Sequence, residues 1–299
     1  MSNPNTIVIF GPSPDSYYVG HGRLHFVENM SPSFTNHAKT ALNISFSRWI
    51  SVSKTADTWI DYNIATDKFH FNADINQNIQ DHFTGANGKV AANFISFPDS
   101  EDSSCYFVKG KRKGGWNAVL PDYFIQQLSK MQREVLNFDA GITGMLFGKG
   151  KTSICLFETG FQANFDEEEI TSEDHPLYKV LLEFSQPNRG WCIEPGSTLC
   201  FYDSRFFYLK FKKPGESIIQ MRSNLPTHIA AKLEELRELA QKPEEQMALM
   251  QQDNGWNQLV MMRINNQMNA TSMMVDIMNR GSLNILAAAS GGHVVERRY

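Results

Sequence analysis

The chain has 299 residues, of which 41% are hydrophobic and 20% are charged, and its formal net charge is −4. This composition is typical of a folded globular protein with enough length for a core, and it excludes wholesale disorder. The mild acid excess, with a sequence pI of about 6.1, argues against non-specific nucleic-acid binding as the main function.

The first residues contain neither the basic segment nor the apolar run that are typical of a signal peptide. No stretch approaches the roughly 18 consecutive apolar residues of a membrane span. The cysteines form no CxxC pair, so neither a zinc site nor a dense disulfide framework is indicated; they are Cys105, Cys155, Cys192 and Cys200. The sequence therefore predicts a cytoplasmic protein with reduced cysteines, no membrane span and no nucleic-acid partner.

Five segments of the chain repeat the same order of signals. Each has a short apolar run, a polar turn, a second run rich in aromatic or β-branched residues, another turn and a third short run. Amphipathic turns of helix often follow, as at residues 121–128 and 175–182. The segments begin near Ile7, Ile50, Ile95, Met145 and Leu199, so that successive starts are 43, 45, 50 and 54 residues apart.

Short runs bounded by turn clusters are typical of β-strands. Three or four strands in each unit predict one small sheet, which cannot bury its faces alone and must stack on its neighbours. The predicted fold is therefore mainly β, with five strand-rich repeats and a helical C-terminal tail. A β-propeller would accommodate these repeats while limiting exposed strand edges. The alternative is that five similar hairpins belong to one mixed α+β sheet.

One unit resembles a blade of the hemopexin-type propellers. In that family a short helix precedes an Asp-Ala strand, and Phe138-Asp-Ala-Gly followed by Gly160-Phe-Gln-Ala is similar to this order. The other units lack the Asp-Ala step, and the sequence lacks the cysteine staple of the family. The resemblance therefore implies an architecture only, and no residue role is taken from it.

The composition changes after Pro226, which divides the chain into a predicted strand-rich domain at residues 1–225 and a helical tail at residues 226–281. In the first part of the tail, strong helix formers accompany apolar residues at Ile229, Leu233 and Leu236, which predicts an amphipathic helix. Residues 282–299 include Gly291-Gly292 and are predicted to form a flexible C-terminus.

A second tail helix is predicted from Trp256 to about Asn279. Its apolar positions follow the three-four spacing of a heptad stripe, with interaction residues Met261, Ile264, Met268, Val275 and Met278. Methionine adapts to more than one packing partner. The stripe could pack on the body of its own chain, form a helix–helix oligomer, or bind another protein or an apolar ligand.

Two glycine- and lysine-rich segments suggest phosphate or nucleic-acid binding, but a hairpin turn is the preferred interpretation of both. A phosphate loop needs a glycine where Met145 stands, and Gly148-Lys-Gly-Lys leads into a strand and not into a helix. The segment from Lys109 to Trp116 joins a basic cluster to an aromatic residue, yet its glycines favour a solvated hairpin.

The histidines do not indicate a metal site. On a strand, His21 and His25 would lie on one face but roughly 13 Å apart, which is too far for two ligands of one ion. The other histidines stand singly, and His70 is interpreted as a structural or surface residue. The sequence therefore predicts neither a metal nor a cofactor.

Aromatic residues near the turns of several units suit stacking on a sugar or a planar apolar ligand. The candidate ligand-binding residues are Trp59, Tyr106, Trp116 and Tyr208. The alternative is that these side chains are buried between the units.

Two functions remain open at this point. The first is a non-catalytic ligand- or protein-binding scaffold whose tail docks on another protein or on a second copy of the chain. The second is a cofactor-independent acid–base enzyme that acts on a small, largely apolar substrate in a central pocket. Its candidate catalytic residues are Asp61, His70, Asp139 and Glu158, chosen from predicted strand positions. Neither a Gly-x-Ser-x-Gly nor a His-Glu-x-x-His motif is present.

Overall fold

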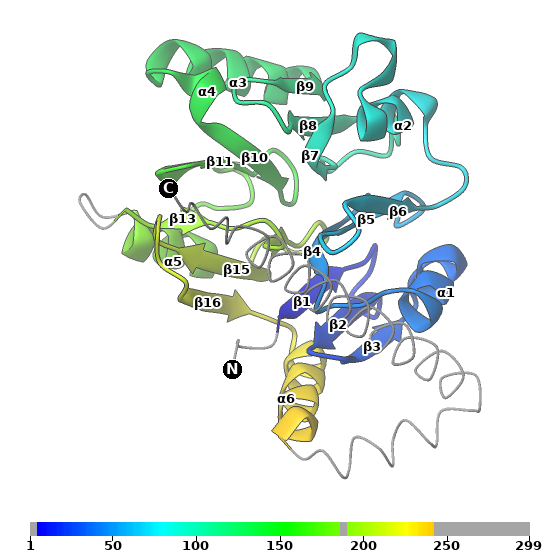
Figure 1. Ribbon diagram of the computed structural model, residues 1–299. Helices are drawn as coiled ribbons and strands as arrows, with labels where there is room; N and C mark the ends of the chain where they lie inside the picture. The colour runs from blue at the N-terminus through cyan, green and yellow to red at the C-terminus, as the bar shows by residue number, and fades with distance from the viewer. Residues whose placement is uncertain (1–4, 186–189, 242–299) are drawn as a thin grey trace, which may run out of the picture. The chain divides into compact units, whose positions relative to one another are not determined.

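The computed structural model describes residues 5–185 and 190–241 of the chain. Backbone contacts divide the chain into Met1–Gln241 and Lys242–Tyr299, and every described element belongs to the first unit. This body is mainly β, with short antiparallel strands in five small sheets and a few short helices (Figure 1). The prediction of small strand-rich units is confirmed, and the strands form separate sheets instead of one mixed sheet.

Four of the sheets have three strands each, which follow one another in chain order. They are β1 (Thr6–Phe10), β2 (Tyr17–His21) and β3 (Leu24–Glu28); β4 (Ser47–Val52), β5 (Trp59–Asn63) and β6 (Lys68–Phe71); β7 (Ala92–Ser96), β8 (Tyr106–Gly110) and β9 (Trp116–Val119); and β10 (Ile142–Phe147), β11 (Ser153–Phe157) and β12 (Gly160–Asn164).

The fifth sheet departs from this pattern at its first strand. Two short strands, β13 (Cys192–Ile193) and β14 (Thr198–Leu199), pair with opposite ends of β15 (Phe207–Lys212). Gly196 lies between them with a φ of +85°, a conformation that glycine adopts without strain. The other edge of β15 pairs with β16 (Ile219–Asn224), so β13 and β14 together take the place of one first strand.

Helices connect successive sheets, α6 follows the last one, and three of the helices begin at a capping side chain. Ser31 and Asn76 accept hydrogen bonds from main-chain N–H groups in the first turn of α1 and α2, and His175 does so for α5. The helical turns predicted at residues 121–128 and 175–182 are confirmed as α3 and α5. The helices are α1 (Pro32–Thr40), α2 (Gln77–Thr84), the 3₁₀ turn η1 (Ala86–Gly88), α3 (Asp122–Glu134), α4 (Phe138–Gly141), α5 (Pro176–Phe184) and α6 (Thr227–Gln241).

The first strands of three sheets share a β-bulge at the same place. The register shifts between Ser47 and Trp49 in β4, between Ala92 and Phe94 in β7, and between Ile142 and Gly144 in β10. A bulge bends a strand and increases its twist, and it is a built feature more than a defect. Its recurrence supports the repeat that the sequence predicted.

Neighbouring first strands are joined by hydrogen bonds from side chains to main-chain carbonyls. The Ser51 hydroxyl on β4 donates to Ile95 O on β7. The Ser96 hydroxyl on β7 donates to Met145 O over 2.6 Å. The Thr198 hydroxyl on β14 donates to Val8 O on β1 over 3.0 Å. These three donors occupy equivalent positions in their units, one residue after the position that accepts.

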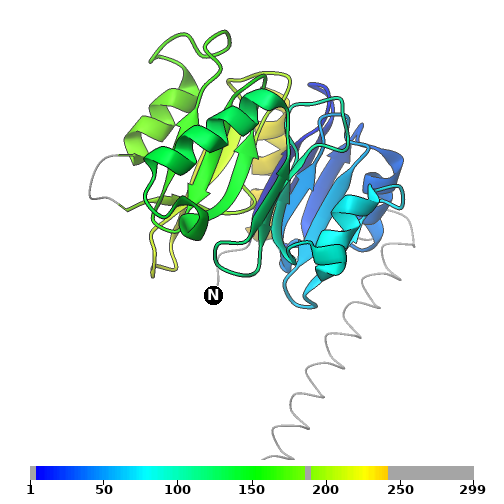
Figure 2. The ribbon, with the colours of Figure 1, turned by 90° about the horizontal axis from the view of Figure 1, so that it is seen from above.

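Contacts between the first strands follow a cyclic order. β1 contacts β4, β4 contacts β7, β7 contacts β10, β10 contacts β14, and β14 contacts β1. In both ribbon views α1, α2, α3 and α5 lie at the outside of the body, and Figure 2 shows the first two sheets, in blue, opposite the green fourth sheet.

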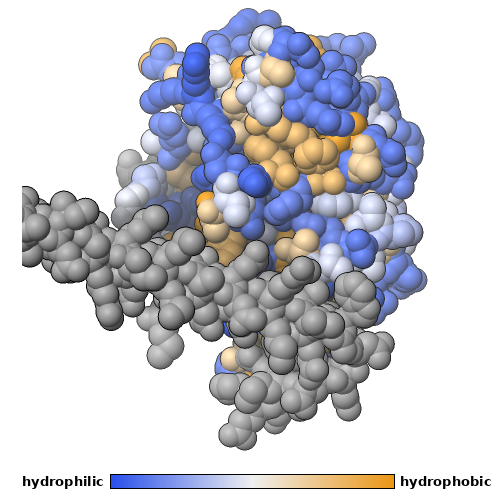
Figure 3. All heavy atoms as spheres, turned by 45° about the vertical axis from the view of Figure 1, so that its right-hand side comes forward, coloured by the Kyte–Doolittle hydropathy of each residue, from blue (hydrophilic) through white to orange (hydrophobic). Residues whose placement is uncertain are grey.

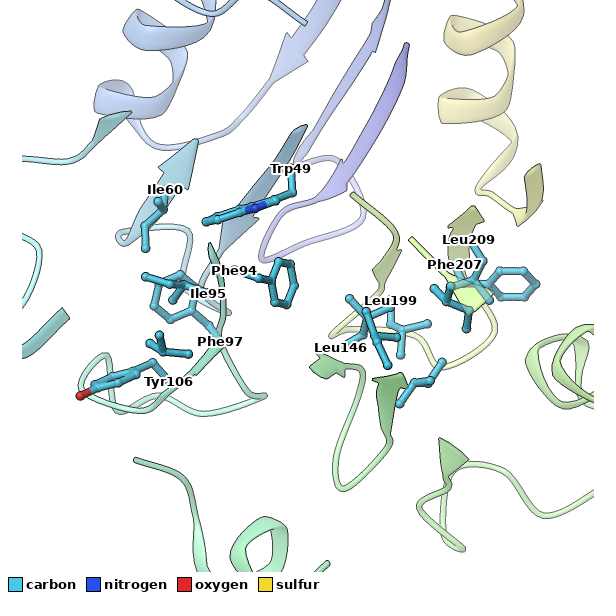
Figure 4. Close-up of a cluster of buried hydrophobic side chains, with 14 of the residues drawn as sticks. Trp49, Ile60, Phe94, Ile95, Phe97, Tyr106, Leu146, Leu199, Phe207 and Leu209 are labelled. Carbon is cyan, nitrogen blue, oxygen red and sulfur yellow. The ribbon is translucent and has the colours of Figure 1, made fainter. Parts of the chain in front are cut away.

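The largest cluster of buried hydrophobic side chains draws on the second to fifth sheets. Figure 4 shows Trp49 and Phe94 beside one another on one side of this cluster, and Leu146 close to Leu199 on the other. The Trp49 indole N–H donates to Asn93 O over 3.0 Å, which ties the second sheet to the third. Large aromatic side chains therefore join the sheets to one another.

Helix α6, at the start of the predicted tail, packs on the first sheet. Its buried residues Ile229, Leu233 and Leu236 lie in one cluster with Val8 and Tyr17, and α6 contacts β2 and β3. The predicted apolar spacing is therefore confirmed for this helix. The second tail helix, with its methionine-rich stripe, and the predicted C-terminus at 282–299 lie outside the described residues. Within the described ranges, no helix is long and apolar enough to cross a membrane.

Candidate functional site

A buried carboxylate stands in the middle of the second sheet. Asp61 lies on β5 and is 1% exposed, although the neighbouring positions of the strand are apolar or aromatic. In the antiparallel register it faces Ile50 on β4 and His70 on β6. Because cross-strand partners project on the same side of a sheet, the register itself brings Asp61 and His70 together. The Nδ1 atom of His70 lies 3.2 Å from Asp61 Oδ2.

A second histidine reaches the same oxygen from a helix. His37 lies on α1, which begins at Pro32 after the capping residue Ser31, and its Nε2 lies 3.1 Å from Asp61 Oδ2. The imidazole of His37 stacks on Trp59, with 4.6 Å between ring centroids. The rigid indole therefore fixes the ring plane of His37 and aims its Nε2 at Asp61.

Burial raises the pKa of Asp61, but hydrogen bonds from His37 and His70 and the nearby Ser47 side chain outweigh it, and the pKa lies below its ordinary value. Asp61 is thus a charged carboxylate at neutral pH. Since a carboxylate only accepts hydrogen bonds, both histidine nitrogens donate to it.

The two carboxylate oxygens of Asp61 accept different numbers of hydrogen bonds. Both histidines converge on Oδ2, whereas Oδ1 is buried and accepts no hydrogen bond from the described residues. The Ser47 side chain lies close enough to lower the pKa of Asp61, but its hydroxyl donates to Asn43 O over 3.2 Å. An unsatisfied buried acceptor is uncommon in a native structure and calls for an explanation.

Aromatic side chains from β2, α1 and β5 pack in a row beside Asp61. Tyr18 on β2 packs against Phe34, which in turn packs against Trp59. The Tyr18 hydroxyl is fully buried and has no hydrogen-bond partner among the described residues. Burial, followed by the charge of Asp61, raises the pKa of Tyr18 well above its ordinary value, so the phenol stays protonated. Two partnerless polar atoms therefore lie in one region between the first and second sheets.

We use the term histidine site for His37, Asp61 and His70. Their nitrogen and oxygen atoms all lie within 4.8 Å of one another. His37 and Asp61 are buried, but the side chain of His70 is 37% exposed, so the site has one side open to solvent. Among the described residues, these three form the one group of histidine, cysteine or acidic side chains with spacing suited to a metal ion.

A separate cavity of about 50 Å³ lies where the first strands of the five sheets meet. Its polar side chains are the hydroxyls of Ser51, Ser96, Ser197 and Thr198, and each of them donates to a main-chain carbonyl. The remaining lining is apolar or glycine, so no acid or base faces this cavity. Organic ligands occupy pockets of several hundred Å³, whereas this volume accommodates only a few water molecules.

The structure brings together two of the four candidate catalytic residues, and none of the four lines the central cavity. Asp61 and His70 are in direct contact in the histidine site. Asp139 is exposed, and the N–H groups of Gln132 and Trp116 that donate to it lower its pKa. Glu158 is exposed in the turn between β11 and β12, 3.5 Å from Lys113.

Three of the four candidate ligand-binding aromatics are buried. Trp59 stacks on the imidazole of His37 in the histidine site, and its indole N–H donates to Ser33. The Tyr106 hydroxyl lies 3.3 Å from His82, and the Tyr208 hydroxyl donates to Met221. These positions match the alternative in which aromatic side chains pack between and within the units.

Trp116 is the partly exposed member of that set. Its ring stacks on Phe107 with 5.9 Å between centroids, and its indole N–H donates to Asp139 over 2.8 Å. The interaction residues Met261, Ile264, Met268, Val275 and Met278 lie outside the described part of the chain.

The segment with the phosphate-loop likeness is a hairpin turn between β10 and β11, as predicted. Its main-chain N–H groups at Gly150 and Lys151 donate to the carboxylates of Asp99 and Asp166, over 2.6 and 2.8 Å. Two anions of the chain itself therefore occupy the donors that a phosphate would need.

The basic segment is the hairpin between β8 and β9, also as predicted. Lys109 turns back, and its ammonium group donates to Arg112 O and Gly115 O. This lysine stabilises the turn from inside. Lys111, at the start of the turn, forms an ion pair with Asp67, which lies in the turn between β5 and β6 of the second sheet.

Comparison of the chain with protein-family models, with curated proteins and with solved structures finds no match. The assignment of a function therefore depends on the geometry of the described residues.

Sequence reasoning missed His37 altogether. It lies 24 residues before Asp61 and on a helix, so no spacing rule links the two. The link between Asp61 and His70 did have a signal, because the turn after Asn63 sets the register of the hairpin and so the partner of Asp61.

Proposed function

We propose that the body of this protein is a five-bladed β-propeller and that the chain is a non-catalytic binding protein, with the body as its rigid scaffold. The cyclic order of contacts among β1, β4, β7, β10 and β14 supports the architecture. Hydroxyl-to-carbonyl hydrogen bonds across three of the five junctions, including that between β14 and β1, support it further. In a closed ring of this kind each small sheet buries its faces against its neighbours.

The observation that carries the binding function is the character of the central cavity. A propeller enzyme would gather acids, bases or a cofactor at one end of its axis. Here the lining is apolar, and every hydroxyl in it is engaged with a main-chain carbonyl. The cavity of about 50 Å³ has neither the room nor the ionisable groups for acid–base chemistry on an organic substrate. The centre of the body is best explained as a structural joint.

Contact surfaces for a partner are present on the outside of the body. Strand β16 is the outer edge of the fifth sheet, and Ile218, Ile219 and Met221 expose 66%, 44% and 41% of their surface there. Leu182 on the adjacent helix α5 is 54% exposed. An edge strand with exposed apolar side chains can serve as a template for association.

A second apolar area lies on another face. Figure 3 turns the side that carries α1, α2 and β6 towards the viewer and shows apolar side chains gathered between polar ones. The partly buried rings of Phe69, Phe71 and Phe83 form a stack on β6 and α2, with centroid distances of 4.8 and 4.6 Å. These rings add apolar surface to β6 of the second sheet and to the adjacent helix α2.

The partner that we propose is a second copy of the chain, engaged through the methionine-rich stripe of residues 261–278. The sequence supports this choice, because a heptad stripe with only Arg263 and Asp276 charged between Trp256 and Asn279 needs an apolar partner. The tail thus joins copies of the scaffold while the body presents its outer surfaces.

Light scattering on the full chain tests this proposal. We expect a mass at least twice that of one chain, and a monomeric mass after deletion of residues 242–299. Met268→Lys places a charge in the stripe and should also give the monomer, whereas Asn266→Lys lies on the opposite side of the heptad and should leave the oligomer intact. A monomeric mass for the full chain would overturn the proposed self-association, and an oligomer that survives Met268→Lys would overturn the stripe as its cause.

A further inference from the structure

We propose that the histidine site binds a divalent transition metal ion of the zinc type, through His37 Nε2, Asp61 Oδ2 and His70 Nδ1. This site is separate from the central cavity and from the apolar surfaces of the scaffold, and it does not depend on how copies of the chain assemble.

Two of the three spacings between the donor atoms match those of a coordination sphere. Bonds of about 2.0–2.2 Å from zinc to nitrogen or oxygen place neighbouring ligands about 3–3.5 Å apart. Asp61 Oδ2 lies 3.1 Å from His37 Nε2 and 3.2 Å from His70 Nδ1, and all three atoms fall within 4.8 Å of one another. Binding of an ion requires the two imidazole nitrogens to move closer than this outer limit of 4.8 Å, and rotation of the partly exposed His70 side chain would bring them together.

The unequal use of the Asp61 oxygens is an independent observation that points to a cation. Two donors crowd on Oδ2, while the equally buried Oδ1 accepts no hydrogen bond from the described residues. A divalent ion beside the carboxylate compensates both oxygens at once, because its field acts on the whole group.

The donor set selects the class of ion. Calcium and magnesium prefer oxygen ligands, whereas two imidazoles with one carboxylate suit zinc and its neighbours in the first transition row. Three protein donors leave at least one coordination position for water. That position falls towards the solvent side, because the His70 side chain is 37% exposed while His37 and Asp61 are buried.

The surroundings hold the ligands in place, as the outer shell of a metal site does. Trp59 stacks on His37 at 4.6 Å and is itself fixed by its hydrogen bond to Ser33, 3.0 Å long. Asp61 and His70 are held by the hydrogen-bonded ladder between β5 and β6. The site is therefore built on a helix and two strands, which position side chains more rigidly than loops do.

Cobalt titration of the full chain, after dialysis against a chelator, tests the proposal. We expect one equivalent of Co²⁺ to produce visible d–d absorption, and Zn²⁺ to displace it and to raise the melting temperature. His70→Gln should weaken this binding by at least about 100-fold, since loss of an outer-shell partner alone costs 10–100-fold. Its half-exposed position should leave the fold of the metal-free protein intact. Asp61→Asn should lose the same equivalent.

His228→Gln is the matched control, because His228 is a described histidine on α6, bonded to Pro14 O and outside the histidine site. It should retain the full equivalent of Co²⁺. Circular dichroism of each metal-free variant separates loss of a ligand from loss of the fold. A wild-type chain without cobalt absorption would show that the three groups form only a hydrogen-bonded cluster. An equivalent that survives both His70→Gln and Asp61→Asn would place the ion elsewhere; either result overturns the proposal.

Discussion

The central cavity and the histidine site both lie where sheets meet, but they differ in whether their buried polar atoms have hydrogen-bond partners. At the cavity, the hydroxyls of Ser51, Ser96, Ser197 and Thr198 each donate to a main-chain carbonyl. At the histidine site, Asp61 Oδ1 and the Tyr18 hydroxyl have no hydrogen-bond partner in the described chain. A buried polar atom without a partner costs about 1–3 kcal/mol.

This difference separates a structural joint from a site. The hydroxyls at the cavity join neighbouring first strands or their own turn, and each of them already donates a hydrogen bond. The histidine site keeps a charged carboxylate in the interior and leaves one of its oxygens unused, which lowers stability unless a ligand compensates it. A bound ligand would therefore relieve an unsatisfied polar atom at the histidine site but not at the cavity.

The largest effect is expected from a charge placed in the cavity. Leu146 on β10 lines it and is 5% exposed, and no cation faces it there. Leu146→Asp should lower the free energy of unfolding by more than about 4 kcal/mol, because lost apolar burial adds to an uncompensated buried carboxylate. Urea unfolding at neutral pH measures this loss. Leu146→Asn, with the same shape and no charge, should lose clearly less. Equal losses for the two variants would mean that water reaches the cavity freely.

Much of the architecture could be predicted because each sheet is built from local signals. Runs such as Ile7–Phe10 and turns such as that at Gly22, with φ of +63°, depend only on neighbouring residues. The same kinds of local signal recur in five segments, which made the sheets easier to predict. The fifth sheet shows the limit of this reasoning. Its first strand is split into β13 and β14 around Gly196, a feature that depends on pairing with the distant strand β15.

The candidate site was harder to predict because its members meet only after packing. The sequence names Asp61 and His70 separately as candidate catalytic residues, and the hairpin register joins them. His37 reaches Asp61 only because α1 packs with Phe34 between Tyr18 and Trp59. Tertiary packing of this kind leaves no spacing pattern in the sequence. Tyr106 and Tyr208, two of the candidate ligand-binding aromatics, are buried, as the alternative interpretation of the sequence expected.

A buried cation at the junction of the fifth and first sheets offers a second comparison with the cavity. The Lys210 ammonium group donates to Asn5 Oδ1 over 3.1 Å, and burial lowers the pKa of Lys210 from 10.5 to about 8. The folded state therefore binds this proton less tightly than the unfolded state does. The stability of the wild-type chain should rise by up to about 3 kcal/mol as the pH increases from about 8 to 10.5, because only the unfolded state is still protonated in that window.

Lys210→Met removes the free-energy cost of burying the ammonium group and should stabilise the protein at pH 7 by about 1–3 kcal/mol. The methylene packing is kept, and the desolvated charge is gone. Urea unfolding at several pH values measures both the gain and the loss of the rise between pH 8 and 10.5. Lys68→Met, at an exposed lysine on β6, is the control and should change neither quantity. A variant that is less stable than wild type at pH 7 would show that the bond to Asn5 outweighs the cost of burial.

The smallest effect is expected from one hydroxyl at the cavity. Ser96→Ala removes the 2.6 Å hydrogen bond to Met145 O across the junction of β7 and β10, and it should cost about 1 kcal/mol, the usual net worth of such a bond. Leu146 occupies the equivalent position in β10, and Ile9 occupies it in β1, so a junction between first strands can form without this hydroxyl. Ser45→Ala, at an exposed serine, should be neutral. A loss well above 3 kcal/mol for Ser96→Ala would mean that the hydroxyl supports more than its own junction. The hydroxyls at the cavity could then no longer be regarded as independent hydrogen bonds, in contrast to the partnerless atoms of the histidine site.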